Sequence, residues 1–137
     1  MGPAPLNQEV AARFLSGGAY ERCLRRARSA YAQRTAAMAA AVLRSFPEGT
    51  RISQPGVGFC LWVEMPLGVD AQELYAAALR AHISITPGPL FSAKLRYRHF
   101  IRLSAARWSD AAEPAVRKLG ALATALSRRR LEPARRG

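Results

Sequence analysis

Apolar residues in the first third of the chain recur at the spacing of an α-helix. From Ala19 to Phe46 they are separated by threes, fours and one seven, which places them on a single stripe. The stripe consists of Tyr20, Leu24, Ala27, Tyr31, Met38, Val42 and Phe46. At about 1.5 Å per residue, this helix would be on the order of 40 Å long. A helix of that length either crosses the whole core of a small domain or extends toward something outside this chain.

Four short segments in the rest of the chain have the composition and bounding residues typical of β-strands. Proline and glycine lie between them, and Pro55-Gly56 is the expected turn between the first two. The expected strands cover residues 51–54, 58–65, 83–86 and 99–105. In the last of them, alternation places Ile101 and Leu103 on one face. Phe100, Arg102 and Ser104 then lie on the other face.

Two more helices are expected around these strands. Asp70 and Glu73 have the spacing of a capping box at the start of a helix over residues 71–81. Ser109 or Asp110 is expected to cap the last helix, in which Pro114 is tolerable because it falls in the first turn. The apolar stripe of that helix consists of Val116, Leu119, Leu122, Ala123 and Leu126.

This order of elements predicts an α+β fold. We expect a two-layer sandwich, in which helices cover one face of a small, mainly antiparallel sheet and a long helix stands at the N-terminal side. The length of 137 residues fits a single domain. We expect an N-terminal arm over residues 1–18 that contains a short helix over residues 6–16, the domain itself over 19–127, and a basic tail over 128–137.

The charge of the chain is strongly positive. Lysine and arginine number 21 against 9 acidic residues, which gives a net charge of +12, and Lys94 and Lys118 are the only lysines. Such a balance is compatible with a free-standing nucleic-acid-binding module. The arginines are spread over both ends and the middle, however, so a solvated basic surface is the favoured interpretation.

Several classes of protein are disfavoured by the pattern. No apolar run is long enough to span a membrane, and the N-terminus lacks the pattern of a signal peptide, so a cytoplasmic protein is expected. Cys23 and Cys60, with His82 and His99 as the only histidines, do not form a zinc motif, and no disulfide is expected. No nucleophile elbow or phosphate loop occurs, so we predict no catalytic residue and no metal site.

Arg102 is the residue for which a chemical role is most open. A guanidinium at the centre of a short strand, opposite two apolar neighbours, points to the uncovered face of the sheet. It could form a surface ion pair, which is usually worth less than about 1 kcal/mol. It could instead hold an incoming carboxylate through two parallel, charge-assisted hydrogen bonds. Its position alone leaves both roles open.

Three stretches resemble a known family. "SQPGVGFCLWVEMP", "DAQELYAAALRAHISITPGPLFSA" and "HFIRLSAARWSD" are similar to the C-terminal small domain of fold-type I, pyridoxal 5′-phosphate (PLP)-dependent aminotransferases. The resemblance is greatest to the aminotransferase-like part of MocR regulators, a subgroup of the GntR transcription factors. It covers residues 6–126, and the combination of "PGPLFSA" with "FIRLS" is its most specific part.

The resemblance implies a site and a set of partners. In the family, a winged-helix DNA-binding domain precedes a large PLP-binding domain, and the small domain closes over the cofactor site. Arg102 stands where the family binds the α-carboxylate of an amino-acid effector or substrate, and Gly58, Phe59 and Phe91 are expected to line the cleft. The chain is thus expected to be a fragment of a transcriptional regulator that binds an amino-acid-like molecule and forms homo-oligomers. The alternative is the C-terminal domain of a true aminotransferase of the 2-aminoadipate type.

The same resemblance implies that PLP belongs to the intact parent protein. The family's Schiff-base lysine lies in the large domain, and neither Lys94 nor Lys118 matches it. This chain alone is therefore not expected to hold the cofactor covalently or to catalyse transamination. Two positions depart from the family pattern: Val57 replaces the first glycine of the usual pair before Phe59, and Cys23 stands where the subgroup often has histidine.

Overall fold

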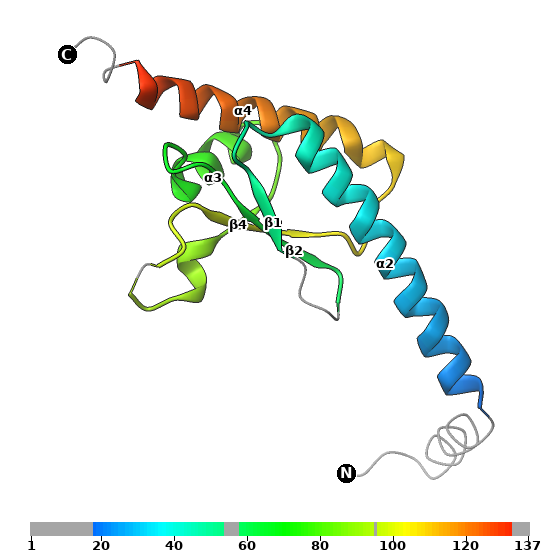
Figure 1. The fold of residues 1–137 in the computed structure, drawn as a ribbon. Helices are drawn as coiled ribbons and strands as arrows, with labels where there is room; N and C mark the ends of the chain where they lie inside the picture. Colours follow the sequence, from blue (N-terminus) through cyan, green and yellow to red (C-terminus); the bar gives the residue numbers. More distant parts are fainter. Residues whose placement is uncertain (1–17, 54–57, 95, 133–137) are drawn as a thin grey trace.

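The computed structural model describes residues 18–53, 58–94 and 96–132. These residues form three α-helices and a four-stranded, fully antiparallel sheet with the strand order β1-β2-β4-β3 (Figure 1). The strands are β1 (Arg51–Ser53), β2 (Cys60–Glu64), β3 (Thr86–Pro87) and β4 (Phe100–Ser104). The helices are α2 (Ala19–Ser45), α3 (Ala71–Arg80) and α4 (Glu113–Leu131), with short 3-10 helices η1 (Gly88–Phe91) and η2 (Asp110–Ala112). The expected helix over residues 6–16 and the Pro55-Gly56 turn lie outside the described residues.

The helices cover one face of the sheet, so the expected α+β two-layer sandwich is confirmed. The inward side chains of β2 and β4 are all buried, and they pack with residues of α2, α3 and α4 in one hydrophobic core. In Figure 1, the segment between β3 and β4 lies on the side of the sheet away from α2 and α4. The central core residues are Val42, Leu61, Val63, Leu74, Ile101 and Leu119.

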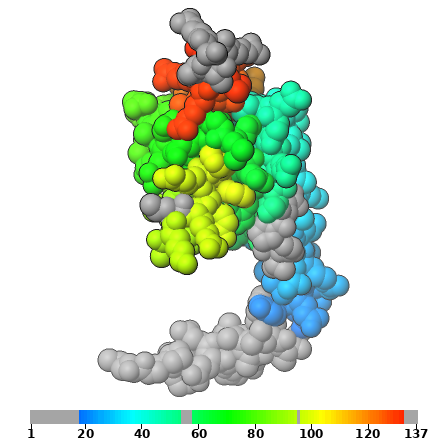
Figure 2. Space-filling model, turned by 60° about the vertical axis from the view of Figure 1, so that its left-hand side comes forward, coloured from blue at the N-terminus to red at the C-terminus, as the bar shows by residue number. Residues whose placement is uncertain are grey.

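Only the second half of α2 takes part in this core. Its buried residues begin at Thr35, whereas Leu24, Ala27 and Tyr31 on the same stripe are only partly buried. Figures 1 and 2 both show the N-terminal half of the helix standing clear of the body of the domain. The helix therefore extends beyond the core that this chain forms, which is one of the two arrangements that its length allows.

Asp70 caps α3 as the sequence predicts. Its Oδ1 accepts hydrogen bonds from the backbone N–H of Gln72 at 2.9 Å and of Glu73 at 3.1 Å. The reciprocal half of the capping box is absent, because the Glu73 carboxylate faces Arg130 at 3.4 Å instead. The Asp70 cap thus satisfies two backbone donors that the first turn of a helix cannot satisfy by itself.

The cap provides a direct test of local stability. Asp70→Ala should lower the free energy of unfolding by about 1 kcal/mol, because both N–H groups lose their acceptor. Asp110→Ala is the matched control, since Asp110 is exposed and caps no helix by its side chain. Urea unfolding followed by circular dichroism would measure both variants, and equal losses would show that the Asp70 hydrogen bonds do not stabilise α3.

Two expected element boundaries are wrong. The strand predicted over residues 83–86 is reduced to Thr86–Pro87, because the chain first closes the end of α3 through the Ile83 N–H, which donates to the Ala78 carbonyl at 2.8 Å. The last helix does not begin at a Ser109 or Asp110 side-chain cap. The Ser109 carbonyl accepts from the Ala112 N–H to form η2, and α4 begins only at Glu113, with Pro114 in its first turn. At its other end α4 continues to Leu131, into the residues expected to form the tail.

Both cysteines are free: Cys23 lies exposed on α2 and Cys60 lies in β2. None of the helices within residues 18–53, 58–94 and 96–132 combines the length and hydropathy that crossing a bilayer requires.

Candidate carboxylate-binding site

Arg102 lies at the centre of the sheet, on the face opposite the three α-helices. It is the middle residue of β4, paired in register with Trp62 of β2 on one side and Thr86 of β3 on the other. Its neighbours Ile101 and Leu103 point into the core, with exposed fractions of 0% and 5%. The division of the two faces of β4 that alternation predicts is therefore confirmed.

The guanidinium of Arg102 is held by an aromatic ring rather than by an acid. Its Cζ lies 4.9 Å from the centroid of the Phe91 ring, which is a cation–π distance. Arg102 has no ion pair or hydrogen bond with any residue in the described part of the chain. An aromatic ring carries no acceptor oxygen, so the N–H donors of the guanidinium have no carboxylate or carbonyl partner among the described residues.

Phe91 reaches this position because the chain makes a close approach at Gly88. A Cβ on Gly88 would lie 2.8 Å from the Phe100 carbonyl oxygen and closer still to the Tyr97 carbonyl oxygen. Only glycine fits at this point, so η1 can pack directly against the segment that leads into β4. The "PGP" sequence thus brings the end of η1, and with it Phe91, over the open face of the sheet.

Four aromatic side chains gather beside Arg102, and we call them the aromatic basin: Trp62, Phe91, Tyr97 and Phe100. Trp62 is central, with ring centroids 5.1 Å from Phe91, 5.9 Å from Tyr97 and 6.3 Å from Phe100. Tyr97 and Phe100 also meet edge to face at 5.4 Å. With Ser53, these residues line a cavity of about 420 Å³.

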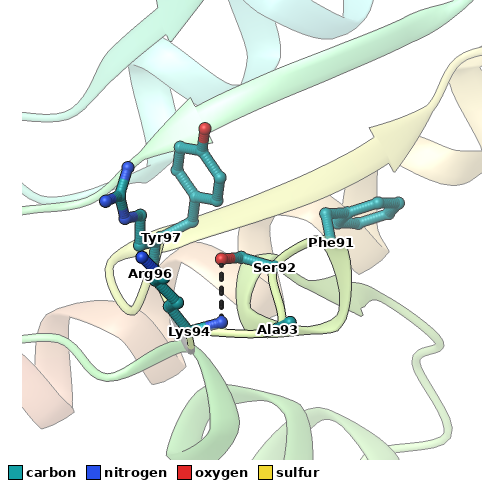
Figure 3. A pocket seen from close by; sticks show the side chains of 6 residues that line it. All are labelled: Phe91, Ser92, Ala93, Lys94, Arg96 and Tyr97. Carbon is teal, nitrogen blue, oxygen red and sulfur yellow. Dashed lines mark hydrogen bonds between the residues drawn. The ribbon is translucent and has the colours of Figure 1, made fainter.

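A second hollow lies at the loop that connects η1 to β4. It has a volume of about 290 Å³ and is lined by residues 91–94, 96 and 97 (Figure 3). Figure 3 shows Lys94 and Arg96 at the end of the loop away from Phe91. Both cations are exposed, and neither forms an ion pair with a described residue.

The three residues expected to line the cleft have different positions. Phe91 lies under Arg102, as described above. Phe59 is directed to the helical side, where its ring centroid is 5.3 Å from that of Tyr31 on α2. Gly58 precedes β2 with a φ of 127°, a backbone conformation that favours glycine. The structure therefore brings Phe91 to Arg102, but not Phe59.

Sequence reasoning missed Trp62 and Tyr97. Trp62 could have been found, because alternation along β2 places it on the face opposite Leu61 and Val63. Tyr97 lies in a loop with a left-handed φ of 63°, for which the sequence has no periodic signal.

A lysine that can reach the cofactor ring is one requirement of a PLP site, and the two lysines of this chain are both exposed. Lys94 belongs to the loop after η1, and Lys118 lies on α4 in the opposite layer from Arg102. What this chain offers is a group that can bind the carboxylate of a ligand.

Comparison with known proteins agrees with this fold. No family model matches the chain. It is 40% identical over 110 residues to the HTH-type transcriptional regulator YdcR of Escherichia coli, an alignment that covers 80% of the chain and 24% of the regulator. It is also 34% identical over 116 residues to the 2-aminoadipate transaminase of Thermus thermophilus, covering 84% of the chain and 29% of that enzyme.

A solved structure gives the same picture. The α-aminoadipate aminotransferase LysN of Thermus thermophilus, complexed with N-(5′-phosphopyridoxyl)-L-leucine, superposes with a TM-score of 0.73 at 33% identity. The match covers 88% of this chain and 31% of that enzyme. The chain therefore belongs to the fold-type I, PLP-dependent aminotransferase-like family, as its small domain. Within that family it resembles the HTH-type regulators of the MocR subgroup, and it spans about a quarter of the length of those relatives.

Proposed function

We propose that this chain is the small domain of a PLP-dependent transcriptional regulator of the GntR/MocR type, and that it binds the carboxylate of the ligand. The observation that carries the proposal is Arg102, which projects from the open face of a rigid sheet with its N–H donors unpaired among the described residues. A planar guanidinium can bind a carboxylate through two parallel hydrogen bonds, and a strand in the middle of a sheet holds it in a fixed position. The similarity to YdcR supports the regulator over other members of the family.

The regulator would act through the position of this domain. A large domain outside this chain would hold PLP, and a winged-helix domain would bind DNA. An amino-acid-like effector would bridge the large domain and Arg102, drawing the small domain toward the cofactor site. Gly49, which follows α2 with a φ of 92°, is one position where the chain could accommodate such a movement.

A true aminotransferase of the 2-aminoadipate type is the second candidate. The similarity to the Thermus thermophilus transaminase supports it, and the same arginine would then bind a substrate rather than an effector. The site residues of this chain do not separate the two functions, because both require the same carboxylate grip.

The reading frame upstream of Met1 tests the proposal. A PLP-binding large domain preceded by a winged helix would support the regulator, and a large domain without a winged helix would support the aminotransferase. If a regulator is found, an amino-acid effector should change its affinity for its operator DNA, whereas the corresponding amine without a carboxylate should not. An operator affinity that no carboxylate ligand changes would contradict the regulatory role.

Self-association is part of the same proposal. The N-terminal half of α2 leaves Leu24 and Ala27 incompletely buried, outside the core. Apolar surface of this kind favours association with a second copy or with the rest of the protein. The isolated chain should therefore sediment as a dimer or weak oligomer at high concentration, and Leu24→Glu should shift it toward the monomer.

Leu43→Glu is the matched control for self-association. Leu43 is an exposed leucine of the same helix, but it lies in the C-terminal half, outside the protruding segment proposed to associate, so the same change there should not alter the sedimentation. A chain that remains monomeric at all concentrations would contradict self-association.

A further inference from the structure

The aromatic basin is unusual because much of it faces solvent. Phe91 is 43% exposed and Tyr97 is 46% exposed, although both rings are held in place by contacts with Trp62. A cluster of aromatic rings on the surface of a small domain generally marks a binding site. The cavity of about 420 Å³ that these rings line falls in the range typical of small-molecule sites.

We propose that the basin selects the side chain of the ligand, and that this ligand is an amino acid with an aromatic side chain. The inference rests on the proposed function, in which Arg102 binds the carboxylate of the same molecule. It adds the chemical class of the ligand, which neither the fold nor the carboxylate grip determines.

The distances allow one amino acid to meet both groups. Trp62 is the register partner of Arg102 on the adjacent strand, and Phe91 contacts both of them. The carboxylate and side chain of an amino acid are separated by only a few bonds. A ligand whose carboxylate meets the guanidinium can therefore place its side chain over Trp62.

The geometry of the basin favours a ring over an aliphatic chain. Phe91 and Phe100 each present an edge-to-face contact to Trp62, with interplanar angles of 70° and 74°. An incoming ring can continue this pattern, since aromatic pairs prefer offset or edge-to-face contacts and gain from them beyond the area that they bury. An aliphatic side chain of equal size would bury similar area without that gain.

An acidic side chain is the main competitor, because Lys94 and Arg96 line the second hollow. These cations lie at the far end of the loop from Phe91, and both side chains are solvated. Salt therefore screens them more than it would a buried charge, so they should contribute less to selection than the rings do.

The test is a titration of the 137-residue chain, labelled with nitrogen-15, with four probes at millimolar concentrations. The probes are L-phenylalanine, L-3-cyclohexylalanine, L-2-aminoadipate and phenethylamine, which lacks the carboxylate. Backbone shifts in β2, β4 and the loop between η1 and β4 report on binding. We expect phenylalanine to bind about tenfold more tightly than cyclohexylalanine or aminoadipate. Phenethylamine should bind at least tenfold more weakly than phenylalanine.

Variants test whether the aromatic basin causes the preference for phenylalanine. Phe91→Leu and Trp62→Leu should each remove most of the preference for phenylalanine over cyclohexylalanine. Leu67→Ala is the control, since Leu67 is an exposed apolar residue outside the basin. Circular dichroism checks that each variant is folded, and two basin variants are used so that the loss of one does not end the test.

Each outcome has a distinct meaning. If aminoadipate binds most tightly, and this binding is lost in Lys94→Ala or Arg96→Ala, the ligand is not an aromatic amino acid. The proposed binding of its carboxylate by Arg102 would still hold. Equal binding of all three amino acids would have the same meaning. Equal binding of phenylalanine and phenethylamine, unchanged in Arg102→Leu, would instead overturn the proposed function and leave only an apolar patch. No shift on the open face with any probe would overturn both.

Discussion

Replacing Arg102 by leucine in the intact PLP-dependent protein should weaken its response to amino-acid ligands by about tenfold to a hundredfold. The change removes the only group on the central strand that can donate two hydrogen bonds to a carboxylate, and hydrogen bonds to charged groups are worth about 1.5–3 kcal/mol. Arg102 contacts no acid in the described part of the chain, so its loss leaves no buried charge unpaired. The absorbance of bound PLP should be unchanged, because no residue of this chain is expected to hold the cofactor.

Two further variants distinguish specific carboxylate binding by Arg102 from a general effect of positive charge. Arg117→Leu removes the same charge from an exposed position on α4, in the opposite layer, and should leave the response unchanged. Arg102→Lys keeps the charge but loses the planar fork, so it should give an intermediate loss. Ligand titrations of the intact protein by calorimetry would measure all three variants. Equal effects of Arg102→Leu and Arg117→Leu would show that only net charge matters.

The faces of the sheet could be predicted from the sequence because a strand has a period of two. Once Ile101 and Leu103 are assigned to the core, Arg102 must lie on the other face, and the structure agrees. The same rule places Trp62 opposite Leu61 and Val63, and Phe100 on the same face as Arg102. Two of the four residues of the aromatic basin could therefore be found from sequence alone. Local periodicity carries this information, and no distant contact is needed.

The remaining two residues have no such periodic signal: Phe91 is expected in the cleft only through the family resemblance, and Tyr97 is not expected at all, because their positions depend on contacts between loops. Phe91 meets Arg102 only because Gly88 packs against the backbone before β4, and Tyr97 adopts a left-handed backbone there. Neither feature has a periodic signal. The positions of these two residues are determined by close approaches that only the folded chain makes. The missed start of α4 has a different origin, since a local hydrogen bond at Ser109 forms η2 before the helix begins.

The most severe of these close approaches joins α2 to α4. Gly120, in the middle of α4, faces the end of α2, where a Cβ would lie 2.6 Å from the carbonyl carbon of Ser45 and closer still to its oxygen. The obstacle is backbone, so it cannot move aside as a flexible side chain would. Gly120→Ala should therefore lower the free energy of unfolding by about 1–3 kcal/mol, because the two helices must separate.

This expected loss has the opposite sign from the usual effect of the same substitution. In an exposed helix interior, glycine is less stable than alanine by about 0.5–1 kcal/mol, so Gly→Ala normally stabilises a helix. Ala121→Gly measures that ordinary difference one residue away, where the side chain is exposed. Thermal or urea unfolding would measure the change in the free energy of unfolding for both variants. A Gly120→Ala variant as stable as the parent chain would mean that α2 and α4 can shift apart at no cost, and the tight crossing would then not be what holds the long helix on the domain.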